Sequence, residues 1–187
     1  MEQPPSNSLL RLRKKHGTGA RRDASVADGE RLVIAQSFTY GLFAGLITIL
    51  IFSVLWVALS SLTNRVFPWL TVVLGAMVGF AVRRAGRGVD WRFPVLAAAL
   101  TLLGALLANI FLAASYTAEI FDTGTLHILR AVTSMTWPVF FDEVLTAADG
   151  FYALFAAGLA AFLANRPLTR SQYYALRLWR AESDRHH

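Results

Sequence analysis

The chain contains no cysteine. That absence excludes disulfides, thiolate metal sites, iron–sulfur clusters and thiol chemistry. Lysine is scarce too, with two lysines against sixteen arginines, and this bias beside abundant Ala, Leu and Gly is typical of a GC-rich bacterial genome. Charged residues make up only 16% of the chain, whereas a soluble domain carries roughly 25%. The shortage of charge indicates a membrane protein.

Two long runs carry no charged side chain, Leu32–Asn64 and Phe93–Ala118. About 20 helical residues cross a ~30 Å hydrocarbon core, so each run predicts a transmembrane helix. The first run would be about 50 Å long as a single helix, and we expect it to tilt or to begin outside the bilayer. Shorter apolar stretches at 66–83 and 144–165 predict two further spans, with Pro68 in the first helical turn of the earlier one.

The predicted fold class is all-α: a polytopic membrane protein with four transmembrane helices and interfacial amphipathic segments. A transmembrane domain is expected over residues 32–166, with spans at about 35–62, 66–83, 93–118 and 144–165. Residues 1–31 are expected to form a flexible basic tail in the cytoplasm, and residues 167–187 an interfacial tail. A short surface helix is expected within Thr125–Met135, where apolar residues recur at a near-helical spacing.

The distribution of Lys and Arg predicts the orientation of the chain. Sixteen of the eighteen lie in the two tails or in the turn between spans two and three, and only Arg65 and Arg130 lie in the other connections. Basic residues are retained in the cytoplasm, so we expect a multi-pass protein of the cell inner membrane with both termini cytoplasmic. Five acidic residues lie on or near the outer face: Glu119, Asp122, Asp142, Glu143 and Asp149.

The turn between spans two and three reads AVRRAGRGVDWRFP and contains Arg83, Arg84, Arg87 and Arg92. Glycines and arginines can cradle a phosphate, yet no Walker pattern is present, and the flanks are membrane spans instead of the strand and helix of a dinucleotide site. Topology explains the charge without nucleotide or nucleic acid, and we expect the four arginines to contact anionic lipid headgroups. The glycines of this turn, Gly86 and Gly88, are expected to permit its tight geometry.

Small residues recur four apart in three of the spans, at Gly41 and Gly45, at Gly75 and Gly79, and at Ala153, Ala157 and Ala161. Rows of this kind allow helix backbones to approach closely. We interpret them as packing within one chain, with packing against another subunit or a second copy as the alternative. Asn109 is the most deeply placed strongly polar residue of the third span, and we expect it to bond to a neighbouring helix rather than to line a transport path.

Motifs for catalysis or metal binding are missing from the sequence. It contains no G-x-S-x-G and no H-E-x-x-H, and no ionisable residue lies at the centre of a predicted span, where a proton relay would place one. Asp149 is interpreted as a helix-start carboxylate. A metal site at His127, with Asp122 or with Asp142 and Glu143, lacks three ligands at defined spacing. We therefore expect no enzyme activity, no metal and no cofactor.

Gly75–Ile110 reads GAMVGFAVRRAGRGVDWRFPVLAAALTLLGALLANI. This stretch resembles a family of small bacterial four-helix integral membrane proteins without an assigned activity, whose members have a Gly-rich span, a basic Gly hinge and an LTLLG-like span. Asp149–Arg166 resembles their last span, so the resemblance covers about a third of the chain. Family members often have Gly-Asn where this chain has Ala108–Asn109, so that feature is kept only in part. The resemblance implies four helices and no known chemistry.

Two classes of function are compatible with this sequence. The favoured class is a non-enzymatic accessory or scaffold subunit of a bacterial inner-membrane assembly, whose partners are membrane lipids and other membrane protein subunits or a second copy of the chain. The alternative is a small oligomeric transporter or channel, with Asn109, Thr101 and the short second span along its path.

Reporter fusions test the predicted threading. An alkaline phosphatase domain placed at either terminus or in the 83–92 turn is expected to be inactive, because all three points lie in the cytoplasm. A fusion in the 119–143 connection is expected to be active. Activity in the 83–92 turn combined with inactivity at either terminus would overturn the threading.

Overall fold

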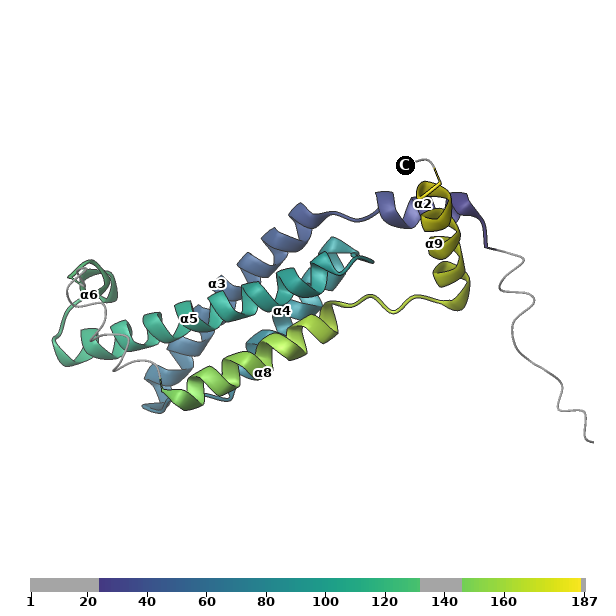
Figure 1. The fold of residues 1–187 in the computed structure, drawn as a ribbon. Helices are drawn as coiled ribbons and strands as arrows, with labels where there is room; N and C mark the ends of the chain where they lie inside the picture. Colours follow the sequence, from purple (N-terminus) through teal and green to yellow (C-terminus); the bar gives the residue numbers. More distant parts are fainter. Residues whose placement is uncertain (1–23, 132–145, 186–187) are drawn as a thin grey trace, which may run out of the picture. The chain divides into compact units, whose positions relative to one another are not determined.

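A computed structural model describes residues 24–131 and 146–185 (Figure 1). Within these ranges the chain forms seven helices and no strand, so the all-α prediction is confirmed. The helices are α2 (Val26–Ile34), α3 (Phe38–Thr63), α4 (Leu70–Gly86), α5 (Arg92–Ile120), α6 (Thr125–Ala131), α8 (Ala147–Ala164) and α9 (Arg170–Ser183). The chain divides into two compact units, Leu32–Pro167 on the one hand and Met1–Arg31 with Leu168–His187 on the other.

Three helices of the described residues are long and apolar enough to cross a membrane: α3 with 26 residues, α5 with 29 and α8 with 18. They match the predicted spans 35–62, 93–118 and 144–165 to within three residues at each end. α4 has only 17 residues and carries Arg83 and Arg84 in its last turn. It is about 26 Å long, somewhat shorter than a ~30 Å hydrocarbon core. It is therefore the one predicted span that is not among the three candidate membrane-crossing helices of the described residues.

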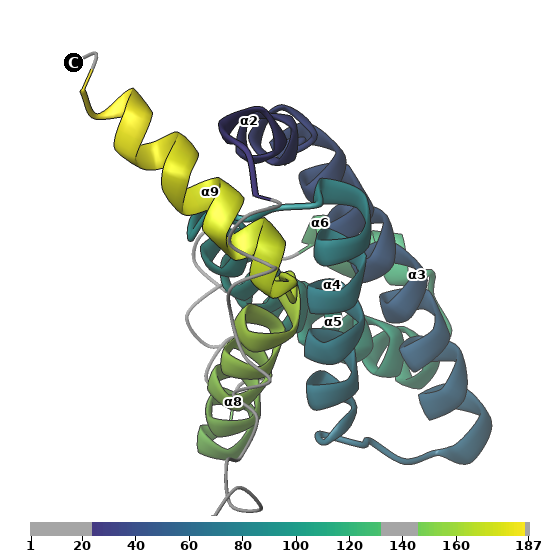
Figure 2. The ribbon, with the colours of Figure 1, turned by 90° about the vertical axis from the view of Figure 1, so that its right-hand side faces the viewer.

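α4 and α5 form the centre of a four-helix bundle in the unit Leu32–Pro167. Each of them packs against the other and against both α3 and α8. Figure 2 shows α3 and α8 on opposite sides of this central pair. Because α4 has three helical neighbours, the side chains of Leu74, Val78 and Val82 have no exposed surface.

Successive helices of the bundle run in opposite directions, which gives it two chemically different ends. The backbone N–H of Ser37, just before α3, donates to the carbonyl of Gly86 at the end of α4, at 2.9 Å. We call this end the basic end, and its arginines are Arg83, Arg84, Arg87, Arg92 and Arg166. The opposite end contains the ends of α3 and α5 and the starts of α4 and α8, with Arg65, Glu119 and Asp149.

α4 approaches α8 closely at two glycines. A Cβ atom added to Gly79 would lie 2.5 Å from the carbonyl oxygen of Ala160, and one added to Gly75 would meet the backbone of Ala156. The backbones of the two helices are therefore in contact, without intervening side chains. Lipid offers no hydrophobic drive for helix association, so van der Waals contact of this kind supplies much of the attraction between spans.

The alanine row of α8 that makes this contact differs from the predicted one. The fully buried alanines are Ala156, Ala160 and Ala164, whereas the predicted row was Ala153, Ala157 and Ala161. Of the predicted three only Ala157 is buried. The helix contains adjacent alanine pairs at 156–157 and 160–161, so two rows at four-residue spacing exist about 100° apart, and the sequence alone does not distinguish them.

α3 packs on the central pair through Gly41 and Gly45. A Cβ atom on Gly45 would lie 2.5 Å from Leu100 Cδ1 on α5 and 3.3 Å from Val82 Cγ2 on α4, and one on Gly41 would lie 3.4 Å from the Cα of Gly86. The structure thus places the predicted glycine rows of α3 and α4 against helices of the same chain.

The charge-free run Leu32–Asn64 is broken rather than continuous. Ser37 is the N-cap of α3, and its side chain accepts a hydrogen bond from the N–H of Tyr40 at 3.4 Å. The side-chain oxygen of Gln36 accepts from the N–H of Val89 at 3.1 Å. These two polar residues separate α2 from α3 and leave α3 about 39 Å long. The sequence predicts that the run tilts or begins outside the bilayer, and the break shortens the continuous helix in it by its first six residues.

α4 begins four residues later than predicted, at Leu70. Pro68, predicted in the first helical turn, lies in the preceding turn, where its carbonyl accepts from the N–H of Thr71 at 3.2 Å. Asn64 ends α3 in a left-handed conformation with φ of 49°, which asparagine tolerates better than most residues. Residues 65–69 reverse the chain between the antiparallel helices, and this reversal leaves fewer residues for α4.

α6 coincides with the first part of the surface helix predicted within Thr125–Met135, and it packs against the end of α5. Residues 132–135 lie outside the described residues. The same holds for Asp142 and Glu143, which the sequence assigns to the outer face.

α2 occupies residues for which the sequence predicts a flexible tail over 1–31; residues 1–23 lie outside the described residues. The Ser25 hydroxyl donates to the Asp28 carboxylate at 2.7 Å, and this hydrogen bond holds the pKa of that carboxyl below its usual value. Gly29 is buried, and a Cβ atom there would lie 2.7 Å from Trp179 Cβ on α9.

α9 begins with a capping box. The Thr169 side chain accepts from the N–H of Gln172 at 3.4 Å, and the Gln172 side chain accepts from the N–H of Thr169 at 3.0 Å. Reciprocal bonds of this kind satisfy helix-start donors that have no intrahelical partner. They fix the start of a helix in the tail 167–187.

Gly79→Ala and Gly158→Ala form a matched pair that tests the contact between α4 and α8. The methyl group at position 79 must displace the α8 backbone, so we expect it to lower the free energy of unfolding by about 1–3 kcal/mol. A Cβ atom on Gly158 meets nothing within 4 Å, so its replacement is expected to be neutral or to stabilise by up to ~1 kcal/mol. Unfolding in detergent micelles measures both, and equal losses would contradict the contact.

Candidate anionic-lipid site

Arginines from three segments line one open groove of about 400 Å³ at the basic end. They are Arg83 and Arg84 in the last turn of α4, Arg87 in the following turn, and Arg166 just after α8. The remaining wall is mostly apolar and comes from Leu32, Ala35, Phe80 and Pro167. The groove therefore joins guanidinium groups to a surface that acyl chains can contact.

Three of the four predicted arginines share this groove. Arg92 is the first residue of α5 and is not among the residues that line it. Arg166 was assigned from the sequence to the end of the last span and not to the site. The sequence contained one signal for including Arg166, because the predicted topology places it on the same membrane face as the 83–92 turn. The structure then brings it to the groove because α4 packs directly against α8.

The turn that carries Arg87 does not use its glycines as predicted. Arg87 itself has the left-handed conformation, with φ of 49°, and its N–H donates to the carbonyl of Arg83 at 3.1 Å. A Cβ atom on Gly86 would lie 2.5 Å from Cε1 of Phe93, and one on Gly88 would overlap the same ring. The two glycines are required because the Phe93 ring packs against them, rather than because the turn needs a positive φ at those positions.

The electrostatics of the groove favour an anion. The guanidinium carbon of Arg83 lies 5.2 Å from the centre of the Phe80 ring, a cation–π contact that orients the side chain. Among the residues that line the groove in the described part of the chain, none is Asp or Glu. Guanidinium groups bind phosphate oxygens bidentately, and a basic residue near an anionic membrane surface gains about 1 kcal/mol. The arrangement suits a lipid phosphate.

Asn109 lies in the half of α5 nearer the opposite end, and its side chain is buried. Its Nδ2 donates to the carbonyl of Ala105 at 3.0 Å, within α5, and the expected bond to a neighbouring helix stays a prediction. The Thr101 hydroxyl likewise donates within α5, to the carbonyl of Ala97 at 2.8 Å. A carbonyl four residues earlier is within reach of such side chains in any helix, so no neighbour is needed. Asn109 also lines a cavity at the opposite end.

Asp149 occupies the first turn of α8 and completes a capping box with Thr146. The Asp149 N–H donates to the Thr146 hydroxyl oxygen at 3.3 Å, and the Thr146 N–H donates to the Asp149 carboxylate at 3.0 Å. The interpretation of Asp149 as a helix-start carboxylate is therefore confirmed.

Comparison of the chain with protein-family models, with curated proteins and with solved structures finds no match. The resemblance to small bacterial four-helix membrane proteins stays a prediction, and the site has to be interpreted from its own chemistry.

The triple variant Arg83→Gln, Arg84→Gln and Arg166→Gln tests the groove as an anionic-lipid site. At about 1 kcal/mol per arginine, we expect its affinity for phosphatidylglycerol to fall by roughly two orders of magnitude. Native mass spectrometry of the detergent-purified protein measures the lipid retained. Arg130→Gln, in α6 and away from both the groove and the cavity at the opposite end, is the control and is expected to bind like the wild type. An equal loss in the control and the triple variant would indicate generic charge attraction instead of a site.

Proposed function

We propose that this protein is a non-enzymatic accessory or scaffold subunit of a bacterial inner-membrane assembly, held by four transmembrane helices with both termini in the cytoplasm. The observation that carries the proposal is the apolar core between the two ends of the bundle, in which Leu74, Val78 and Val82 are fully buried. The spans of the bundle pack tightly on one another, and its outer faces remain apolar.

Four crossings require that α4 also spans the bilayer. It is about one turn short of a ~30 Å core, and two features compensate for the difference. Arg83 and Arg84 in its last turn can extend towards the headgroups. Before its start, the rings of Phe67 and Trp69 pack edge to face with centroids 6.3 Å apart, and aromatic residues favour the membrane interface.

The orientation is supported by the separation of charge between the two ends of the bundle. The basic end has five arginines and one acidic residue, Asp90, whereas the opposite end has two arginines, Arg65 and Arg130, with Glu119, Asp122 and Asp149. Since basic residues are retained on the cytoplasmic side, the basic end faces the cytoplasm in this proposal.

A structural role is supported by the chemistry of the buried polar residues. Among the described residues of the bundle these are Ser53, Ser60, Thr71, Thr101 and Asn109. None of them titrates near neutral pH, so they offer no proton acceptor or donor for acid–base catalysis.

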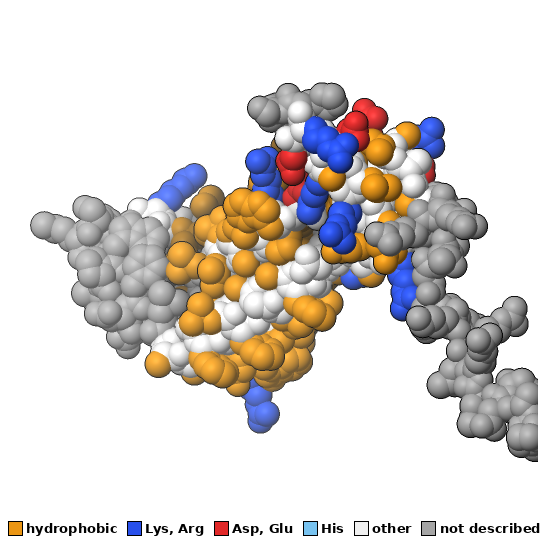
Figure 3. All heavy atoms as spheres, turned by 45° about the vertical axis from the view of Figure 1, so that its right-hand side comes forward, with side chains coloured by type: hydrophobic (Ala, Val, Ile, Leu, Met, Phe, Trp, Pro, Cys, Tyr) orange, Lys and Arg blue, Asp and Glu red, His pale blue; other side chains and the backbone are white. Residues whose placement is uncertain are grey.

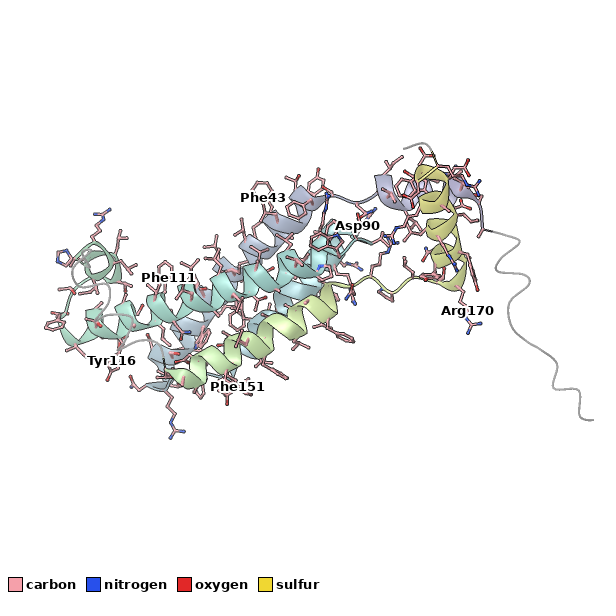
Figure 4. The ribbon with its side chains drawn as sticks, viewed as in Figure 1. Phe43, Asp90, Phe111, Tyr116, Phe151 and Arg170 are labelled. Atoms are coloured by element: carbon pink, nitrogen blue, oxygen red, sulfur yellow. The ribbon has the colours of Figure 1, made fainter. Side chains whose placement is uncertain are left out.

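Exposed apolar side chains cover the outside of the bundle. Phe43 on α3, Phe111 on α5 and Phe151 on α8 are 57%, 40% and 68% exposed and point away from the bundle (Figure 4). Figure 3 shows hydrophobic side chains spread over the visible face of these helices. Lipid tails, another membrane subunit or a second copy can contact such faces, and these are the partners that the proposal assigns.

The alternative function, a small oligomeric transporter or channel, needs a path across the membrane. Within one chain the groove at the basic end and the cavity at the opposite end are separated by fully buried apolar side chains, among them Leu74 and Val78. A path would therefore have to run between copies.

Purification in a gentle detergent, followed by reconstitution of the product, separates the two functions. The accessory role predicts recovery in a stoichiometric complex with another membrane protein, and proteoliposomes of the isolated chain that hold potassium and proton gradients. A lone homo-oligomer that dissipates a gradient, and loses this flux in a folded Asn109→Leu variant, would contradict the accessory role.

A further inference from the structure

A second cavity, of about 460 Å³, lies at the opposite end of the bundle. It is lined by the end of α3, the turn into α4, the second half of α5 and the start of α8. Its apolar wall includes Val66, Pro68, Leu112 and Ala113. A cavity of this size lies within the range of small-molecule sites, about 300–1,000 Å³.

The cavity is lined by a buried hydroxyl group that has no partner. Ser60 is 7% exposed, and its Oγ makes no hydrogen bond among the described residues. Other hydroxyls of the bundle donate to the carbonyl four residues earlier, as Thr63 does at 2.7 Å and Thr117 at 2.9 Å. A buried hydroxyl without a partner is destabilising, so Ser60 is available for a hydrogen bond to a ligand.

Asn109 lines the same cavity from α5. Its Nδ2 is engaged with the carbonyl of Ala105 at 3.0 Å, which leaves the amide oxygen as an acceptor. Ser60 and Asn109 together provide hydrogen-bonding groups of neutral charge on two different helices.

Acidic residues outnumber basic ones among the described residues that line this cavity. Glu119 and Asp149 line it together with one basic residue, Arg65. Glu119 accepts from the Ser61 hydroxyl at 3.0 Å, which ties the end of α3 to the end of α5 and holds the carboxylate in place. Ionised carboxylates accept hydrogen bonds and donate none, so the cavity selects a head that donates hydrogen bonds and carries positive charge.

From these groups we infer that the cavity binds an amphipathic molecule with a primary ammonium head. The ammonium lies near Glu119 and Asp149 and donates to Ser60, and the apolar part extends along Leu112 and Val66 towards Asn109. Two sources supply this chemistry, a lipid with an ethanolamine headgroup or a soluble alkylamine. In a lipid, the phosphate pairs with Arg65, which also lines the cavity.

The test compares phosphatidylethanolamine with phosphatidylcholine of the same acyl chains, by native mass spectrometry of the detergent-purified full chain. The choline head is cationic but donates no N–H bond. We expect ethanolamine lipid to bind more tightly, Glu119→Gln to abolish the preference, and Ser60→Ala to reduce affinity about threefold to tenfold. Ser53→Ala is the matched control, because its Oγ is also buried and unpartnered but the residue does not line the cavity.

Hexylamine, probed by thermal shift, distinguishes the soluble source. If hexylamine raises the melting temperature of the wild type but not of Glu119→Gln, and the two lipids bind equally, the ligand of this site is an alkylamine and not a lipid. Equal binding of both lipids without a hexylamine effect would overturn the inference, and so would equal losses in Ser60→Ala and Ser53→Ala. Neither result depends on the accessory role or on a partner subunit.

Discussion

The contact between α4 and α8 at Gly75 and Gly79 is the interaction on which the bundle depends. Because these two residues have no Cβ atom, the backbone of a helix too short to be a typical span lies directly on that of its neighbour. In a bilayer such contact replaces the hydrophobic drive that water would provide. It keeps α4 in the centre of the bundle, with α5 beside it and α3 and α8 on either side.

The position of α4 determines the chemistry of both ends. Its last turn brings Arg83 and Arg84 beside Arg166, so arginines far apart in the sequence share one groove. At its other end, the turn from α3 contributes Val66 and Pro68 to the second cavity. The apolar core between the two sites separates a basic groove suited to phosphate from an acidic cavity suited to ammonium.

The sequence predicts the helical class, the three long apolar helices and the arginine-rich turn, because runs without charge and clusters of charge are properties of single segments. It does not predict features that depend on a neighbour. The choice between alanine rows 156–160 and 157–161 depends on which face of α8 meets α4. The role of Gly86 depends on where the Phe93 ring lies, and the break at Gln36 and Ser37 is supported by bonds to the α4–α5 turn.

The central claim is that α4 also crosses the bilayer, as the second of four spans. Because the chain lacks cysteine, single cysteines introduced as Val66→Cys and Arg84→Cys report the two ends of α4 without background. The account predicts that a membrane-impermeant maleimide labels position 66 in intact spheroplasts and position 84 only after permeabilisation. Labelling of both positions from the same side would contradict it.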